Sequence, residues 1–165
     1  MARFLYGTPP KPVRKVTLSG DQAVLGSDTP SVVDFDNVIF NTFAAGAWDN
    51  AAATFGALKA GYYEVTAEII FDEIQIDSDQ MQVYLMTTGP GGAAAAGAGG
   101  GGCVQIDQFN VDATSVEQHT MNVTSILYLD IGDETHIRIR QVGGVAQAVV
   151  KGAASFQTGL TIQLL

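Results

Sequence analysis

The sequence has few of the residues on which disulfides, metal sites and enzyme centres are built. It contains one cysteine, Cys103, and two histidines, His119 and His136, among 165 residues. A single cysteine excludes an internal disulfide, and so few nitrogen and sulfur ligands argue against a transition-metal centre. Neither histidine accompanies a nucleophile-elbow motif, so we predict that the protein is not an enzyme.

Positive charge and long apolar runs are also scarce. Lysine and arginine number 8 against 17 aspartates and glutamates, which gives a net charge of −9. This sign disfavours binding to nucleic acid, because the phosphate backbone is itself negative. No apolar run approaches the roughly 18 residues of a membrane-spanning helix, and the first 20 residues lack the apolar core of a secretory signal. We therefore expect a soluble globular protein without nucleic-acid or membrane partners.

The positive charges that do occur are concentrated at the N-terminus. Residues 1–20 contain four of the eight and no acidic residue, so the rest of the chain sums to −13. Three of the five prolines, Pro9, Pro10 and Pro12, lie there too, and proline disfavours helix interiors and central strands. The pattern predicts an extended basic arm over residues 1–30, followed by one domain over residues 31–165.

The arm has the composition of a docking segment. It combines basic residues with three consecutive bulky apolar residues, and its candidate contact residues are Arg3, Phe4, Leu5, Tyr6, Lys11, Arg14 and Lys15. A positive arm can lie on the acidic surface of a partner while the acidic body keeps the particle soluble. The alternative is a frayed terminus with no partner.

From residue 31 onward, short runs rich in Val, Ile, Thr, Phe and Tyr alternate apolar and polar positions between turn residues. Alternation with a period of two indicates strands of a sheet with one buried face. The sequence predicts strands over residues 32–41, 61–71, 81–87, 120–130, 135–141 and 155–165, with a hairpin turn at Gly132-Asp133-Glu134. Many short strands without a helical stripe favour an antiparallel sandwich or barrel.

A glycine- and alanine-rich stretch interrupts this pattern at residues 89–102. It offers no reactive side chain, and it is not followed by the Lys and Ser or Thr of a phosphate-binding loop. We interpret it as a long flexible loop, or a closely packed one, between two strands.

Two further groups of residues could bind ligands. Asp72, Asp77 and Asp79 could supply the oxygen ligands that calcium prefers, although alternating carboxylates also suit a solvated strand. Trp48, with Asp49 and Asn50, could stack on a sugar, although a lone tryptophan also serves core packing. No other cofactor is indicated.

Three motifs, in order, carry a resemblance to a known family. They are a short strand ending in Phe55 before Gly61-Tyr62-Tyr63, the hairpin Leu127–Ile137 around Gly132-Asp133-Glu134, and the closing strand Phe156-Gln157-Thr158-Gly159-Leu160. Together they resemble the complement globular-head and tumour-necrosis-factor type of jelly roll over residues 31–165. The resemblance implies an all-β, ten-stranded, antiparallel two-sheet jelly roll that assembles as a homotrimer and binds through loops and outer faces. Some family members bind calcium near the trimer apex, which would suit the aspartates.

The basic arm, without a collagen-like stalk or a signal peptide, makes the chain similar to bacteriophage virion proteins. We therefore predict a capsid decoration, or cement, protein that contacts the major capsid protein or another virion component through its arm. Its location would be the virion, assembled in the host cytoplasm. The alternative is the receptor- or carbohydrate-binding head of a phage fibre or a cell-surface adhesion module.

Overall fold

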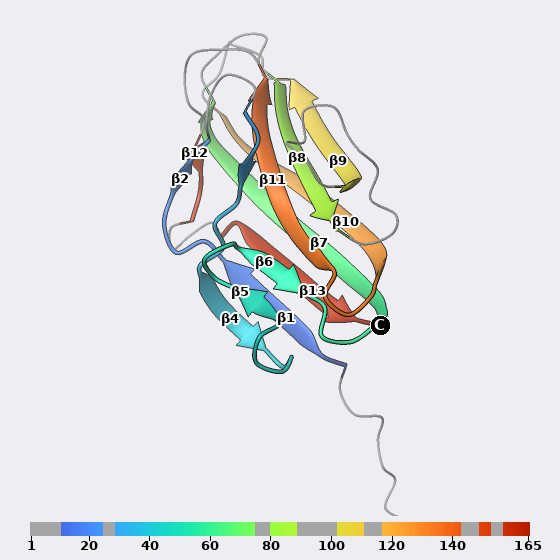
Figure 1. Ribbon diagram of the computed structural model, residues 1–165. Helices are drawn as coiled ribbons and strands as arrows, with labels where there is room; N and C mark the ends of the chain where they lie inside the picture. Colours follow the sequence, from blue (N-terminus) through green and yellow to red (C-terminus); the bar gives the residue numbers. More distant parts are fainter. Residues whose placement is uncertain are drawn as a thin grey trace, which may run out of the picture.

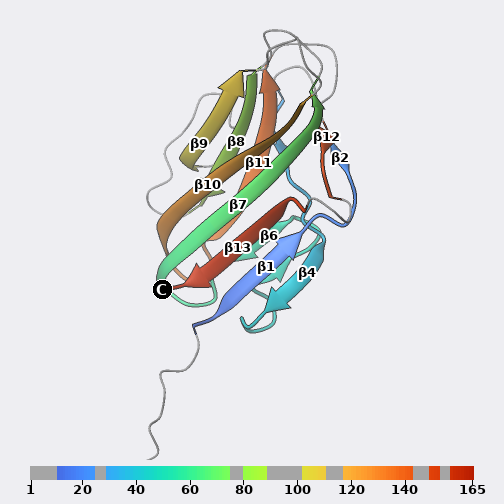
Figure 2. The same ribbon diagram turned by 180° about the vertical axis from the view of Figure 1, so that it is seen from behind.

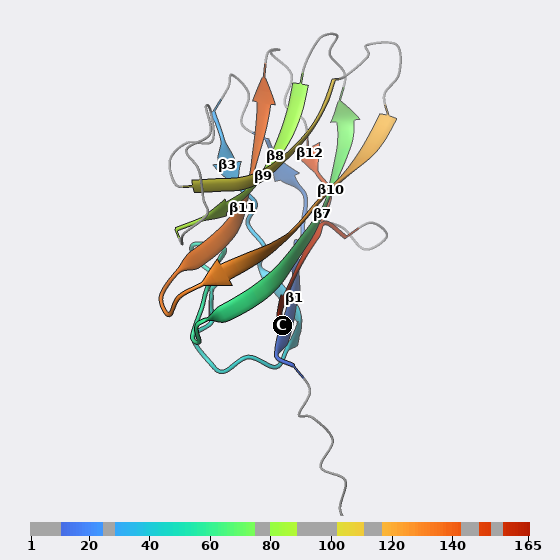
Figure 3. The same ribbon diagram turned by 90° about the vertical axis from the view of Figure 1, so that its right-hand side faces the viewer.

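The computed structural model describes residues 11–24, 29–74, 80–88, 102–110, 117–142, 149–152 and 157–165. These residues form thirteen β-strands and no helix, and the strands make two antiparallel sheets that face each other (Figures 1 and 3). Within these ranges, no helix could cross a membrane. The predicted fold class, an all-β antiparallel sandwich, is confirmed.

The first sheet, sheet A, has seven strands in the order β2-β12-β7-β13-β1-β4, with β10 pairing along the other side of β7 (Figure 2). Their bounds are β1 Val13–Thr17, β2 Gln22–Ala23, β4 Asn37–Asn41, β7 Gly61–Ile74, β10 Glu117–Leu129, β12 Val149–Val150 and β13 Gly159–Leu164. Every pairing in sheet A is antiparallel, as a jelly roll requires.

The second sheet, sheet B, has six strands in the order β5-β6-β11-β8-β9, with β3 also pairing with β11. Their bounds are β3 Ser31–Val32, β5 Trp48–Asp49, β6 Thr54–Gly56, β8 Gln80–Thr87, β9 Gly102–Asn110 and β11 Glu134–Val142. Four of the thirteen strands in the described ranges are only two residues long. Without these four, nine strands of three or more residues remain, against the ten expected.

The predicted alternation of buried and exposed residues is present in the long strands. In β7, Tyr63, Val65 and Ala67 are buried while the residues between them face outward, and in β11 Ile137 and Ile139 are buried in the same way. Residues 130–133 form the predicted hairpin turn, in which the Asp133 amide donates to the Asp130 carbonyl at 3.1 Å. Gly132 has a φ of 91°, a conformation that glycine adopts without steric cost.

Side chains from both sheets fill the space between the layers, and an aromatic cluster closes one end of it. The Phe55 ring lies 5.1 Å from Phe43 and 5.6 Å from Tyr63, centroid to centroid, both edge to face. The Tyr63 hydroxyl donates to the Lys59 carbonyl at 2.5 Å, so the one polar atom of this buried ring has a partner. Burial of large apolar side chains is the main stabilising term in such a fold.

Strand β1 corrects the predicted boundary between arm and domain. Val13–Thr17 pairs with β13 on one side and with β4 on the other, so it lies inside sheet A. Three prolines in the preceding residues had suggested an extended arm up to residue 30, but Pro12 is the last of them and β1 begins directly after it. Residues 1–10 lie outside the described residues.

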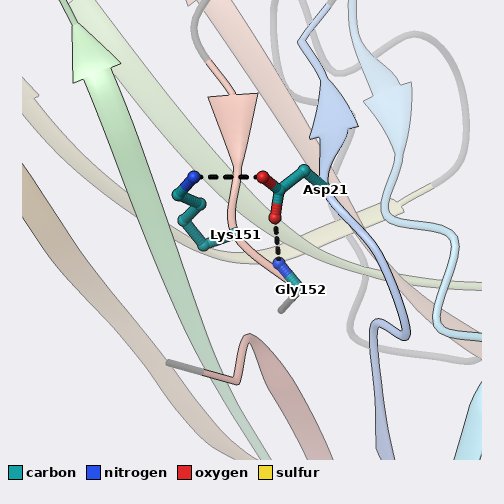
Figure 4. A network of polar contacts seen from close by, with 3 residues as sticks. All are labelled: Asp21, Lys151 and Gly152. Atoms are coloured by element: carbon teal, nitrogen blue, oxygen red, sulfur yellow. Dashed lines mark hydrogen bonds and ion pairs between the residues drawn. The ribbon is translucent and has the colours of Figure 1, made fainter. Parts of the chain in front are cut away.

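A charged contact ties two loops of sheet A together (Figure 4). One carboxylate oxygen of Asp21 forms an ion pair with the Lys151 ammonium at 3.0 Å. The other oxygen accepts a hydrogen bond from the Gly152 amide at 3.0 Å. Gly152 is closely packed, because a Cβ built there would lie 2.0 Å from the Gly20 carbonyl oxygen. The connection between β1 and β2 therefore packs directly against Gly152, the second residue after β12.

This close approach predicts that Gly152→Ala destabilises the domain. The added methyl group overlaps backbone atoms of Gly20, which must shift to make room, so we expect the free energy of unfolding to fall by about 2 kcal/mol, measured by urea denaturation. Gly56→Ala is the matched control, because no atom lies within 4 Å of a Cβ at that position. Equal stability of the two variants would contradict the packing described for Gly152.

Candidate functional site

The outer face of β7 and β10 carries apolar side chains that face away from the core. Tyr62 is 59% exposed, Ile126 is 60% exposed and Tyr128 is 41% exposed. Tyr62 is directly opposite Tyr128 in the antiparallel register, and their rings meet edge to face with centroids 5.2 Å apart. We call these three residues the outer apolar patch.

The strand pairing explains why the patch forms where it does. Side chains alternate between the two faces of a strand, so the buried Tyr63, Leu127 and Leu129 force Tyr62, Ile126 and Tyr128 onto the opposite face. Further along the same pair of strands the outer face becomes polar, and the Thr124 hydroxyl donates to the Thr66 hydroxyl at 3.2 Å. The outer apolar patch therefore borders a polar area, around Thr66 and Thr124, on the same face of sheet A.

The outer apolar patch is suited to contact with another protein surface. Contiguous exposed apolar side chains with polar neighbours are typical of protein–protein interfaces. Tyrosine is frequent in such interfaces because its ring buries a large area while its hydroxyl keeps a polar partner. The structure assigns Tyr63 to the core and Tyr62 and Tyr128 to the surface.

A pocket of about 250 Å³ opens at the end of the sandwich where β1 begins. Its lining is largely apolar and includes Pro12, Phe43, Tyr63 and Leu164. The Pro12 carbonyl accepts a hydrogen bond from the Leu164 amide at 3.0 Å, so the first and last strands of sheet A meet beside the pocket. Its lining contains no nucleophile paired with a base, and it is suited to an apolar group.

The predicted arm residues do not share one environment. Lys11 and Lys15 are exposed, as a docking segment requires. Arg14 is instead buried within the sandwich, because its position on β1 turns it toward the core between the two exposed lysines. Burial removes Arg14 from the surface on which an arm could contact a partner. Arg3, Phe4, Leu5 and Tyr6 lie outside the described residues.

The predicted sugar-stacking residues form a turn that is occupied by its own contacts. Trp48 in β5 is half-buried and packs against the core, with the Arg14 guanidinium carbon 5.8 Å from its ring centroid. The Asp49 carboxylate accepts hydrogen bonds from the amides of Ala51 and Ala52 at 2.8 and 3.2 Å. Asn50 is exposed at the tip. The surroundings of Trp48 are those of a side chain that packs against the core, which is the alternative given above to sugar stacking.

The predicted calcium ligands are not brought together in the described part of the chain. The backbone of Asp72 lies in β7 opposite Val149, whereas Asp77 and Asp79 lie outside the described residues. Within the described ranges, no group of three or more His, Cys, Asp or Glu residues could hold a metal ion. The calcium site stays a prediction.

The cysteine and one histidine are held in uncharged forms. Burial raises the pKa of Cys103, whose thiol donates to the Gln105 carbonyl at 3.3 Å. Burial, together with the neighbouring Arg138, lowers the pKa of His136 to about 4. Its Nε2 accepts a hydrogen bond from the Arg138 Nε at 3.1 Å, which requires a neutral imidazole. These environments disfavour a thiolate nucleophile and a histidine base at neutral pH.

The depressed pKa of His136 predicts that acid destabilises the domain. Between pH 6.5 and about 4 the unfolded chain takes up a proton at His136 that the folded chain does not, so the free energy of unfolding falls as the pH is lowered through this window. We expect His136→Gln to reduce this dependence between pH 7 and 5, measured by urea denaturation at each pH. If the free energy of unfolding falls with pH equally in the wild type and the variant, the lowered pKa of His136 is contradicted.

Comparison with known proteins confirms the fold. No protein-family model matches the sequence, and no curated protein does. Among solved structures, the chain is similar to Eiger TNF from S. frugiperda, with a TM-score of 0.65 at 14% identity over 94% of this chain and 93% of that one. Murine APRIL gives a TM-score of 0.65 at 10% identity, over 94% of this chain and 100% of the other.

The globular domain of zebrafish complement 1qA is also similar, with a TM-score of 0.58 at 14% identity over 94% of this chain and 98% of that one. At such identities these likenesses concern the fold alone. They confirm the tumour-necrosis-factor-like and complement globular-head jelly roll that the sequence motifs predicted. The predicted virion role is not addressed by them and stays a prediction.

Proposed function

We propose that the chain is a non-enzymatic structural protein of a virion, a homotrimer that decorates a capsid through its N-terminal segment. The observation that carries the proposal is the outer apolar patch of Tyr62, Ile126 and Tyr128, which a monomer would leave in water. Burying this face between identical subunits removes apolar area from water, and each subunit contributes the same residues to the interface. The motif resemblance implies three copies around one axis, and the similarity of fold supports that resemblance.

The N-terminal segment supports the attachment step. Its basic residues precede a body whose remaining residues sum to −13, so the segment and the body carry opposite charge. Exposed Lys11 and Lys15 extend this positive charge up to and into β1. Three such segments on one trimer would bind an acidic capsid surface with avidity, because the first contact raises the effective concentration of the other two.

The alternative, a carbohydrate-binding head centred on Trp48, has less support. The Arg14 guanidinium lies over the Trp48 ring, and the Asp49 carboxylate is used by the turn that it caps. A sugar-stacking site needs an open aromatic face with free polar groups around it.

The trimer predicts that a charge in the outer apolar patch dissociates the protein. Light scattering should give about three times 17.3 kDa for the wild type and 17.3 kDa for Ile126→Lys, because a lysine there cannot be desolvated without a partner. Ile131→Lys is the matched control, because Ile131 is equally apolar and 72% exposed but lies in the hairpin turn. A monomeric wild type, or equal masses for the two variants, would refute the proposed interface.

The arm predicts that removing residues 1–10 together with Lys11→Gln and Lys15→Gln, which takes away the exposed positive charges as well as Phe4, Leu5 and Tyr6, abolishes attachment and leaves the trimer intact. The deletion stops before Pro12 and so spares β1, which a longer truncation would remove from sheet A. We expect loss of co-sedimentation with capsids assembled from the accompanying major capsid protein, with unchanged mass and melting temperature. Retained co-sedimentation would count against the arm, and saturable sugar or cell binding that survives the deletion would favour the receptor-binding alternative.

A further inference from the structure

Arg14 occupies a position that a sandwich normally gives to an apolar side chain. It lies on β1 between β13 and β4, directly opposite Ile162, and only 8% of the residue is exposed. Its neighbour Lys15 is exposed on the other face of the same strand. Across the sandwich, Trp48 on β5 of sheet B lies under the guanidinium, with 5.8 Å between the guanidinium carbon and the ring centroid.

Three side-chain nitrogen atoms of this pair are buried and have no hydrogen-bond partner in the structure. Arg14 Nε and Nη1 are fully covered and make no hydrogen bond, and neither does the buried Nε1 of Trp48. None of the described carboxylates forms an ion pair with Arg14. Contact with the indole ring offsets only part of the cost, because a cation–π interaction is weak compared with the desolvation of a charge.

The chemistry of these donors defines what would satisfy them. A guanidinium remains protonated even where burial lowers its pKa, as it does for Arg14, so the positive charge persists at neutral pH. Guanidinium and indole nitrogens donate hydrogen bonds and accept none. The missing partner is therefore an acceptor that carries negative charge and presents more than one oxygen atom.

The pair lies close to one edge of each sheet. Strand β4 is an edge strand of sheet A, β5 is an edge strand of sheet B, and β1 is next to β4. Figure 1 shows β1, β4 and β5 together at one end of the sandwich. Arg14 and Trp48 therefore lie near the edge of the sandwich rather than at its centre.

We propose that Arg14 and Trp48 form a binding site for a carboxylate or phosphate group of a small ligand, which enters between β4 and β5. The guanidinium supplies the charge and a planar set of donors that fits both groups, and the indole N–H supplies a further hydrogen bond. The site is independent of the outer apolar patch, which lies on the other face of sheet A and belongs to β7 and β10.

Trp48 makes the site measurable, because it is the only tryptophan of the chain. The full-length protein in a chloride-free zwitterionic buffer is titrated separately with acetate and with inorganic phosphate, following tryptophan fluorescence and the melting temperature. We expect a saturable fluorescence change and a rise in Tm of about 3 °C or more when the anion is well above its dissociation constant. The anion that saturates the response at the lower concentration, acetate or phosphate, identifies whether a carboxylate or a phosphate is preferred.

Two variants separate the site from general effects of salt. Lys15→Met removes one positive charge from the exposed face of the same strand and should respond as the wild type does. Arg14→Met fills the buried position with an apolar chain, and we expect it to fold and to lose the saturable response. Its melting temperature in anion-free buffer should equal or exceed that of the wild type, because a buried unpaired charge is removed.

A third variant tests the indole donor. Trp48→Phe keeps an aromatic ring over the guanidinium but lacks the N–H, so we expect the half-saturating concentration, read from Tm, to rise about fivefold to tenfold. No saturable response in the wild type, or an equal response in Arg14→Met, would overturn the proposal. Either result would leave the oligomeric mass unchanged, so the failure of this site is distinguishable from failure of the proposed trimer.

Discussion

Strand β7 has hydrogen-bonded partners along both of its edges, with β10 on one side and β13 and β12 on the other. Its alternate residues supply both the core, through Tyr63 and Val65, and the outer apolar patch, through Tyr62. A shift of its register by one residue would exchange these two sets. The sandwich and the proposed subunit contact therefore depend on the same strand pairing.

Both proposals start from residues that depart from the usual distribution of polar and apolar groups. Tyr62, Ile126 and Tyr128 are apolar on the water-facing side of sheet A, and Arg14 is charged on its core-facing side. Local departures of this kind destabilise an isolated chain and are expected where function requires them. In the first case another subunit would supply the missing surface, and in the second a ligand would supply the missing charge.

The sequence predicted the long strands well because their alternation is regular. The predicted strands over residues 61–71, 81–87 and 135–141 correspond closely to β7, β8 and β11. The sequence did not predict β1, because the prolines before it indicated an extended arm and Arg14 and Lys15 were assigned to that arm as contact residues. The outer apolar patch was also missed as a site, although Ile126 and Tyr128 alternate with buried Leu127 and Leu129 and so mark a strand that is apolar on both faces. The contact of Arg14 with Trp48 joins two sheets, and no local pattern predicts it.

The pairing of β1 with β13 constrains how fast and in what order the domain folds. Val13 lies opposite Gln163 in the antiparallel register, so the middle of sheet A joins the first and last described strands. Contacts between residues so distant in sequence slow folding, because the loop entropy is lost before the contact is gained. During synthesis, β1 must wait for almost all of the chain to leave the ribosome. Until then β1 can pair with β4 only, and its edge toward β13 stays unpaired, which is the kind of edge on which partly folded chains aggregate.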